Sequence, residues 1–161
     1  MKPFASLAKC ACAILMLTVA GVLNAPARAA DGPVWTEDYA AALKAAKKDH
    51  KMLLLDFTGS DWCPYCIQLT KEVFGTPEFA RWVSNKFLLV ELDYPNEKPQ
   101  TAAVKQQNKQ MKDKYAITGY PTVIILDSDE KELARSIGYG GEKPDEWIKA
   151  RDADIAKAQA K

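Results

Sequence analysis

Cys63 and Cys66 are separated by two residues, Pro64 and Tyr65, and this spacing allows the two thiols to form and reopen a disulfide. The thiolate is the reactive species in such an exchange, and a free cysteine with a pKa near ~8.5 is mostly protonated at neutral pH. At the start of a helix, Cys63 would face unpaired backbone N–H groups and the positive end of the helix dipole, which favour its thiolate. We therefore expect Cys63 to be the exposed nucleophile. Cys66, one turn further along, would attack the mixed disulfide and release the substrate.

The other thiols and the histidine argue against a metal site. Cys10 and Cys12 fall in an N-terminal segment of different character. Beyond that segment the chain offers two thiols and one histidine, His50, which we expect on the surface, whereas structural zinc takes four ligands. A structural disulfide over so short a span would gain little chain entropy. We therefore interpret Cys63 and Cys66 as a redox pair and expect neither a metal ion nor another cofactor.

Residues 1–29 have the pattern of a signal peptide. Two lysines precede an apolar run over 11–23, and Ala27-Arg28-Ala29 supplies the small residues of a cleavage site. The apolar run is shorter than the roughly 20 residues of a spanning helix, so an uncleaved membrane anchor is the less favoured alternative. We expect an exported protein with a single domain over 30–161.

The net charge gives no support for a polyanionic partner. The whole chain has a formal charge of +1, and loss of Lys2, Lys9 and Arg28 with the leader would take it to −2. A nearly neutral chain has no electrostatic reason to bind nucleic acid or an anionic membrane surface. About 130 residues are enough for one hydrophobic core without disulfide staples, and we expect a monomer.

Hydrophobic patterning predicts helices alternating with short apolar strands. Trp35, Tyr39, Leu43 and Ala46 recur at helical spacing and predict a helix over 36–48. The continuous apolar run over 52–58 is typical of a strand buried on both faces. The other predicted elements are a helix from the cysteines to 73, a helix starting at Thr76-Pro77, a strand over 87–92, a helix over 101–115, strands over 122–127 and 132–138, and a helix from Pro144. The order α-β-α-α-β-α-β-β-α predicts one α/β domain with a mixed sheet covered by helices.

Three motifs give the chain a resemblance to a known family. They are Leu55-Asp56-Phe57, Trp62-Cys63-Pro64-Tyr65-Cys66 and Gly119-Tyr120-Pro121-Thr122. The chain resembles the thioredoxin superfamily over about 35–155, in particular exported thioredoxin-like proteins whose active site reads Gly-Ser-Asp-Trp-Cys-x-x-Cys. The resemblance implies the thioredoxin fold, a periplasmic location and thiol:disulfide oxidoreductase activity.

The resemblance also implies a substrate-binding surface around the cysteines. Its expected members are Trp62, Pro64, Tyr65, Tyr120 and Pro121. Pro121 would lie in a cis-proline loop that pairs with the substrate backbone, and Tyr120 would touch the substrate. From the residues alone, Trp62 is also compatible with an ordinary core aromatic and Pro121 with an edge or turn proline.

Asp56 is an acid inside an apolar strand, where burial should raise the pKa of its carboxyl group. The resemblance implies that this carboxylate takes the proton of Cys66 during exchange. The chain departs from the thioredoxin pattern at two points. Asp56 precedes Cys63 by seven residues instead of six, and Glu91 stands nearest to the position of the lysine that faces the aspartate in thioredoxins. A strand-end acid that reaches water is therefore the alternative interpretation of Asp56.

The dipeptide between the cysteines bears on the direction of electron flow. Cys-Pro-Tyr-Cys is the pairing found in glutaredoxins, whose potentials are about −200 to −230 mV. It lacks the histidine of the strongly oxidising Cys-Pro-His-Cys proteins. We hypothesise a moderately reducing protein that passes electrons to disulfide-containing exported proteins and is kept reduced by a membrane thiol:disulfide electron donor. A copper chaperone using the same thiols, an oxidase or isomerase of the same fold, and a non-catalytic binding module are the alternatives.

Overall fold

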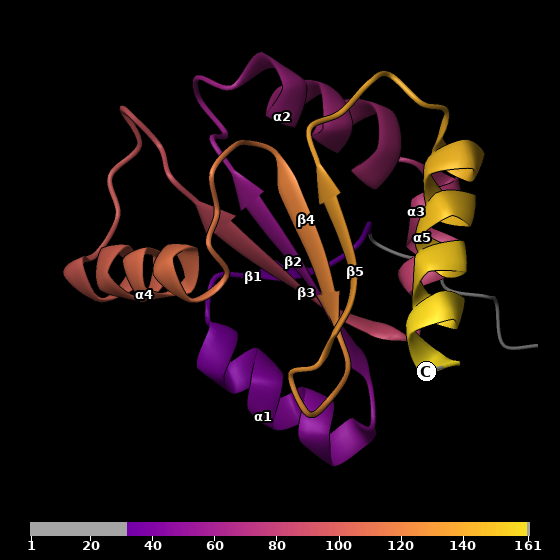
Figure 1. Cartoon of the computed structure of the whole chain (residues 1–161). Helices are drawn as coiled ribbons and strands as arrows, with labels where there is room; N and C mark the ends of the chain where they lie inside the picture. Colours follow the sequence, from indigo (N-terminus) through magenta and orange to yellow (C-terminus); the bar gives the residue numbers. More distant parts are fainter. Residues whose placement is uncertain (1–31, 161) are drawn as a thin grey trace, which may run out of the picture.

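Residues 32–160, which the computed structural model describes, contain one five-stranded sheet (Figure 1). Its strands are β1 (Trp35–Thr36), β2 (Met52–Thr58), β3 (Phe87–Asp93), β4 (Thr122–Leu126) and β5 (Glu132–Ile137), in the spatial order β1-β3-β2-β4-β5. The central strand β2 is parallel to β3 and antiparallel to β4. On the two edges, β1 joins β3 in parallel and β5 forms an antiparallel hairpin with β4. The predicted mixed sheet is therefore confirmed.

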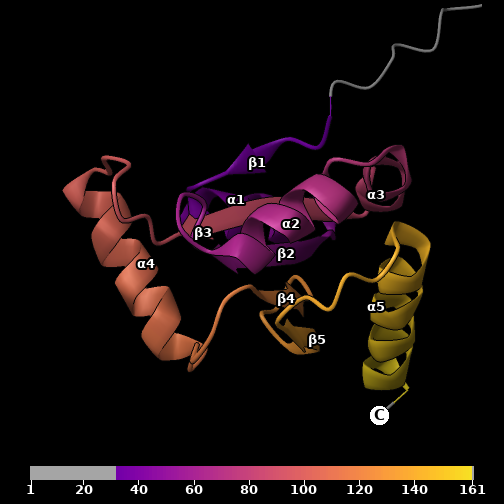
Figure 2. The same cartoon turned by 90° about the horizontal axis from the view of Figure 1, so that it is seen from above.

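Helices cover both faces of the sheet. They are α1 (Tyr39–Asp49), α2 (Pro64–Leu69), α3 (Pro77–Val83), α4 (Ala102–Lys114) and α5 (Pro144–Gln159), and α2 continues into a π-helical turn, η1 (Thr70–Phe74). The core on one face takes side chains from α2, η1, α3 and α5, and the core on the other face takes them from α1 and α4. Figure 2 shows α4 and α5 far apart, with the strands between them.

The pleat of β2 sends alternate side chains to opposite faces of the sheet. Leu53, Leu55 and Phe57 pack in the core formed with α1 and α4. Leu54 packs in the other core, with residues of α2, η1 and α3. By this alternation Asp56 points to the same face as Leu54, which is the face that carries α2.

Trp35 requires a correction to the predicted first helix. The helix begins at Tyr39, with Asp38 as its side-chain N-cap, and Trp35 lies before it in β1. The Trp35 ring packs against Phe74 and Phe79, with centroid distances of 5.1 and 6.3 Å. These contacts lie in the core on the opposite face from Tyr39. The helical spacing of Trp35 is therefore coincidental, because a strand of two residues is too short to show a period of its own.

One predicted helix start and one predicted surface position are confirmed. Thr76 caps α3, because its side chain accepts a hydrogen bond from the amide of Phe79 at 3.3 Å, and Pro77 takes the first helical position. His50 ends α1 in the left-handed conformation and is exposed, the surface position expected for it.

The predicted signal peptide over 1–29 lies outside the described residues, together with Cys10 and Cys12. Between residues 32 and 160, no helix has both the length and the apolar character needed to cross a membrane.

Candidate active site

The cysteine pair lies where the chain passes from β2 into α2. Cys63 is the N-cap residue of α2, with an extended backbone, and Pro64 takes the first helical position. Cys63 and Cys66 are joined by a disulfide, and their Cα atoms are 5.2 Å apart. The Cys63 Sγ also accepts a hydrogen bond from the amide of Cys66 at 3.3 Å. The predicted position of Cys63 at a helix start is confirmed, and the amide that would stabilise its thiolate is in place.

The exposure of Cys63 differs from the expectation. Cys63 is 4% accessible and Cys66 is 2% accessible, so in the disulfide form both are buried. The reason is geometric: the Cys63 Sγ is bonded to the sulfur of Cys66 and faces the first turn of the helix. The side chains around the pair are the exposed ones, since Pro64 and Tyr65 both reach the surface.

Trp62 stands at the surface beside the disulfide and is not a core aromatic. Its side chain is 41% exposed, and its indole Nε1 donates a hydrogen bond to the backbone carbonyl of Tyr94 at 2.7 Å. The indole lies across Gly59, where an added Cβ would come within 2.4 Å of the ring. Its ring also meets Tyr120 edge-on, with centroids 5.7 Å apart. Trp62 is therefore held in one orientation while its face remains accessible.

The turn before β4 brings Tyr120 and Pro121 next to Trp62. The Tyr120–Pro121 peptide bond is cis, and Pro121 is buried while Tyr120 is half-buried. Two hydrogen bonds fix this turn: the Gly138 amide donates to the Pro121 carbonyl at 2.8 Å, and the Thr122 hydroxyl donates to the Gly119 carbonyl at 2.8 Å. The contact between Tyr120 and Trp62 places the turn beside the cysteine pair.

Several neighbours of this surface were not predicted. Tyr94 packs against Tyr120 with a centroid distance of 5.3 Å, and the ammonium of Lys112 lies over both rings, at 5.6 and 5.3 Å. Ile67 on α2 and Ile137 at the end of β5 are large apolar side chains that are 49% and 64% exposed. Ile67 directly follows Cys66, whereas Tyr94, Lys112 and Ile137 come from distant segments that no local sequence pattern joins to the cysteines.

Asp56 is 3% accessible, so it is not a strand-end acid that reaches water. Its Oδ1 has no hydrogen-bond partner. The pKa of Asp56 is raised well above its ordinary value, first by burial and then by the negative charges of Glu91 and Asp93. A raised pKa makes the ionised form of this carboxyl group a stronger proton acceptor than an ordinary aspartate.

The turn between β2 and α2 is the place where the chain has one residue more than the thioredoxin pattern. This turn is hydrogen-bonded to the segment after β3. The Asp61 carboxylate accepts hydrogen bonds from the amides of Asn96, Glu97 and Lys98, at 2.9, 2.8 and 3.1 Å. These amides lower the pKa of Asp61. Ser60 adds a hydrogen bond from its amide to Asp93 at 2.9 Å. These hydrogen bonds fix the turn between β2 and α2 against the segment after β3.

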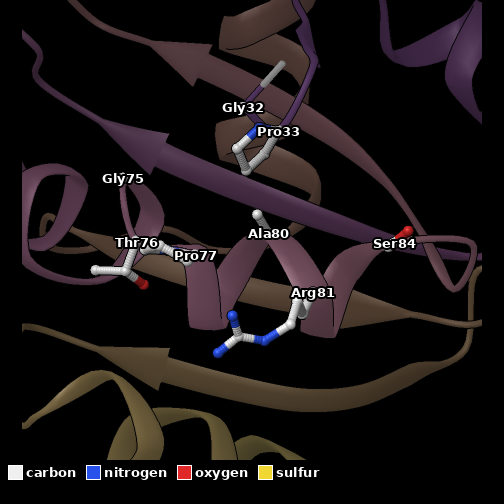
Figure 3. Close-up of a pocket in the computed structure, with 8 residues that line it drawn as sticks. All are labelled: Gly32, Pro33, Gly75, Thr76, Pro77, Ala80, Arg81 and Ser84. Carbon is white, nitrogen blue, oxygen red and sulfur yellow. The ribbon is translucent and has the colours of Figure 1, made fainter. Parts of the chain in front are cut away.

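A pocket of about 530 Å³ lies elsewhere, between the segment before β1 and α3 (Figure 3). Its lining residues are Gly32, Pro33, Gly75, Thr76, Pro77, Ala80, Arg81 and Ser84. None of these is a predicted site residue. Within the described part of the chain, no group of three or more His, Cys, Asp or Glu side chains is arranged to hold a metal ion.

A disulfide at the start of a helix, on the same face of the sheet as a buried carboxyl group, defines a dithiol–disulfide site on a mixed α/β sheet. The sequence model of the thioredoxin-like domain matches residues 39–153. The chain belongs to this family, and the predicted thioredoxin fold is confirmed.

Three relatives show where the chain stands within the family. It is 37% identical over 129 residues to the thioredoxin-related protein DsbJ of Chlamydia pneumoniae, which covers 80% of this chain and 37% of DsbJ. It is 38% identical over 99 residues to the disulfide bond reductase DsbH of Chlamydia pneumoniae, which covers 62% of this chain and 60% of DsbH. The thiol:disulfide interchange protein DsbD of Photorhabdus laumondii is 31% identical over 90 residues, 56% of this chain and 14% of DsbD. The match therefore spans less than two thirds of the length of each of these curated relatives.

A solved structure of a DsbH oxidoreductase superposes with a TM-score of 0.74 at 32% sequence identity. The superposition covers 80% of this chain and 88% of that structure. Nearly the whole of that fold is therefore shared with the present chain.

Proposed function

We propose that this chain is a thiol:disulfide oxidoreductase that works through Cys63 and Cys66 and acts mainly as a reductase. The observation that carries the proposal is the disulfide at the capped start of α2, on the same face of the sheet as the buried, unpartnered carboxyl of Asp56. The names of two relatives, the disulfide bond reductase DsbH and the thiol:disulfide interchange protein DsbD, support the proposal.

The reaction runs in two exchanges from the dithiol form. The Cys63 thiolate attacks a substrate disulfide, one substrate sulfur leaves as a thiolate, and a mixed disulfide joins Cys63 to the other. Cys66 then gives its proton to the Asp56 carboxylate and attacks the Cys63 sulfur. The second substrate thiolate leaves, and the Cys63–Cys66 disulfide forms. Two electrons have passed from the protein to the substrate.

The surface around the disulfide fits an extended polypeptide. Trp62, Pro64 and Tyr65 are exposed beside Cys63, and Tyr120 closes the same surface from the turn before β4. Pro121 leads into β4, and its carbonyl is already taken by the Gly138 amide, so substrate pairing in this turn falls to the other backbone groups. The side chains are mostly apolar, which suits partners whose disulfides lie in unfolded or flexible segments.

The reducing direction, the partners and the location complete the proposal. The relative DsbH is named a disulfide bond reductase, and Cys-Pro-Tyr-Cys lacks the histidine of strong oxidants. The substrates would be disulfide-containing exported proteins in the periplasm. A membrane thiol:disulfide electron donor would return the chain to its dithiol form.

Reduction of insulin by dithiothreitol, followed with and without the protein, tests the activity. We expect the wild type to accelerate reduction, Cys63→Ser to abolish the effect, and the exposed control Ser84→Ala to retain it. Cys66→Ala should trap partners as mixed disulfides on Cys63. Titration against glutathione and dithiothreitol buffers tests the direction, and a potential above about −150 mV would reassign the protein as an oxidase.

A further inference from the structure

Glu91 is the direct neighbour of Asp56 on the adjacent strand. The parallel ladder of β2 and β3 pairs Asp56 with Glu91, Leu54 with Leu89, and Thr58 with Asp93. Neighbouring strands lie about 4.8 Å apart, and paired residues project to the same face. Leu54 and Leu89 both pack in the core under α2, so Asp56 and Glu91 share that face.

The two carboxyl groups differ in their access to solvent and in their partners. Asp56 is buried and its Oδ1 is unpartnered, whereas Glu91 is half-buried. No described side chain donates a hydrogen bond to either carboxylate. The pKa of Glu91 is raised overall, mainly by burial and then by the negative charge of Asp93. Lys98 opposes this shift, and Glu37 adds a small further increase.

The surrounding charges do not cancel the effect of Glu91 on Asp56. The Asp93 carboxylate accepts hydrogen bonds from the amide and the hydroxyl group of Ser60, and the Lys98 ammonium bonds to that same hydroxyl at 2.7 Å. Lys98 therefore lies across Ser60 from Asp93. The helix on that face, α2, contains no Asp, Glu, Lys, Arg or His, and the two cysteines at its start carry no charge as a disulfide. From β4 the paired residue is Val123.

We propose that Glu91 is a positioning residue of the exchange reaction: its negative charge beside Asp56 sets the pH above which Asp56 becomes the carboxylate that accepts the proton of Cys66. The proposal rests on the proposed function. In the thioredoxin pattern a lysine faces the aspartate, and here a group of opposite charge pairs with it on β3. A lysine would favour the aspartate anion, whereas Glu91 disfavours it.

The consequence is a stronger base that is ionised over a narrower pH range. Once Asp56 loses its proton, its carboxylate lies beside a second negative charge, so it takes a proton from Cys66 more readily. The fraction of Asp56 in that form falls at a given pH. The rate at which Cys66 attacks the mixed disulfide should therefore begin to fall, on acidification, at a higher pH than it would with a neutral residue at position 91.

Glu91→Gln removes the charge with almost no change of shape, and Glu91→Lys reverses it. In the disulfide form, in which neither cysteine titrates, the carbon-13 chemical shift of the Asp56 carboxyl should titrate about one pH unit lower in Glu91→Gln. In Glu91→Lys the titration should move further in the same direction. The single-turnover rate of the attack of Cys66 on a Cys63 mixed disulfide should also be measured against pH. The pH at which this rate falls on the acidic side should move by the same amount. Glu97→Gln, which removes an exposed acid from the loop after β3, should change neither.

Three outcomes are decisive. An Asp56 titration that stays in place in Glu91→Gln overturns the proposal. So does an Asp56 titration that moves while the limb of the Cys66 attack does not. In an Asp56→Asn background, Glu91→Gln should shift nothing further, and a remaining shift would also overturn it. Failure of the proposed function is separate, since it would appear as wild-type protein that does not accelerate insulin reduction.

Discussion

Among the described side chains, Asp56 Oδ1 is the one buried nitrogen or oxygen atom without a hydrogen-bond partner. A buried carboxyl group without a hydrogen-bond partner is costly when charged, because desolvation penalises the anion. An acid whose pKa is raised on folding holds its proton more tightly in the folded state. Its contribution to stability is complete below the unfolded pKa near ~3.9 and is lost as the pH rises toward the folded pKa.

Asp56→Asn should therefore stabilise the fold at high pH and much less at low pH. We expect the free energy of unfolding in urea, with the disulfide intact, to rise by about 1–3 kcal/mol at pH 8. The gain should shrink toward pH 3, because Asp56 is then mostly protonated in both the folded and the unfolded state. Asp49→Asn, which removes an exposed acid from the end of α1, should show no such pH dependence. A gain of equal size at both pH values would contradict the assignment.

Gly59 is required by the close approach of Trp62. A Cβ at this position would lie 2.4 Å from the indole, and the ring is fixed on its other side by Tyr94 and Tyr120. Gly59→Ala should destabilise the fold by about 1–3 kcal/mol in chemical unfolding and slow insulin reduction, because the indole must move. Gly32→Ala is the matched control, since nothing lies within 4 Å of its added Cβ. Equal stability of the two variants would refute the close contact.

At the scale of elements, the turn after β2 and the loop after β3 act as one unit. Asp61 holds three consecutive amides of that loop, and Trp62 holds the Tyr94 carbonyl. The three hydrogen bonds to the Asp61 carboxylate are strongest when Asp61 is ionised. Because the pKa of Asp61 is lowered, its stabilising effect is present above the unfolded pKa and is lost as the pH falls through the folded pKa.

Asp61→Ala should free the amides of Asn96, Glu97 and Lys98. We expect their hydrogen exchange to become faster at pH 7, while amides in β2 keep their protection, because the strand ladder does not depend on this side chain. Asp129→Ala, a change in the turn between β4 and β5, should leave the loop unaffected. Unchanged exchange at residues 96–98 would show that water replaces the carboxylate without loss.

The elements that the sequence predicted well are those with a strong local signal. The run over 52–58 coincides with β2, and the strand predicted over 87–92 differs from β3 by one residue. β1 was missed because two residues cannot show alternation. The cysteine pair and an acid inside an apolar strand could be predicted from local patterns, whereas Trp62 was expected at the site only through the family resemblance. Two features could not be predicted from local patterns, because they depend on which distant segments become neighbours in the fold. They are the pairing of Glu91 with Asp56 and the hydrogen bonds between Asp61 and the amides of residues 96–98.

At the scale of the whole molecule, β1 attaches the segment before α1 to the core that supports the cysteines. Trp35 stacks on Phe79 with an interplanar angle of 4°, and its strand pairs with Leu89 and Val90 of β3. The family match begins at residue 39 and does not include this strand. The structural unit is therefore longer than the matched domain.

Trp35→Ala should lower the free energy of unfolding by about 2–3 kcal/mol, less than for a fully buried tryptophan because the ring is partly accessible. Val34→Ala is the control, because Val34 is 82% exposed and its loss should change stability by less than about 0.5 kcal/mol. Guanidinium unfolding measures both. Similar values for the two variants would mean that β1 adds nothing to the fold.

The placement of the four tryptophans has an optical consequence. Trp35, Trp82 and Trp147 belong to one aromatic cluster, with Trp82 and Trp147 centroids 6.0 Å apart, so their emission reports the integrity of that cluster. Trp62 alone stands apart from it, directly before Cys63, where a disulfide quenches indole emission and a pair of thiols quenches it less. Reduction of the disulfide should therefore increase the fluorescence of Trp62, while the emission of the other three tryptophans stays constant. A single fluorescence trace can then follow electron transfer in a chain that remains folded.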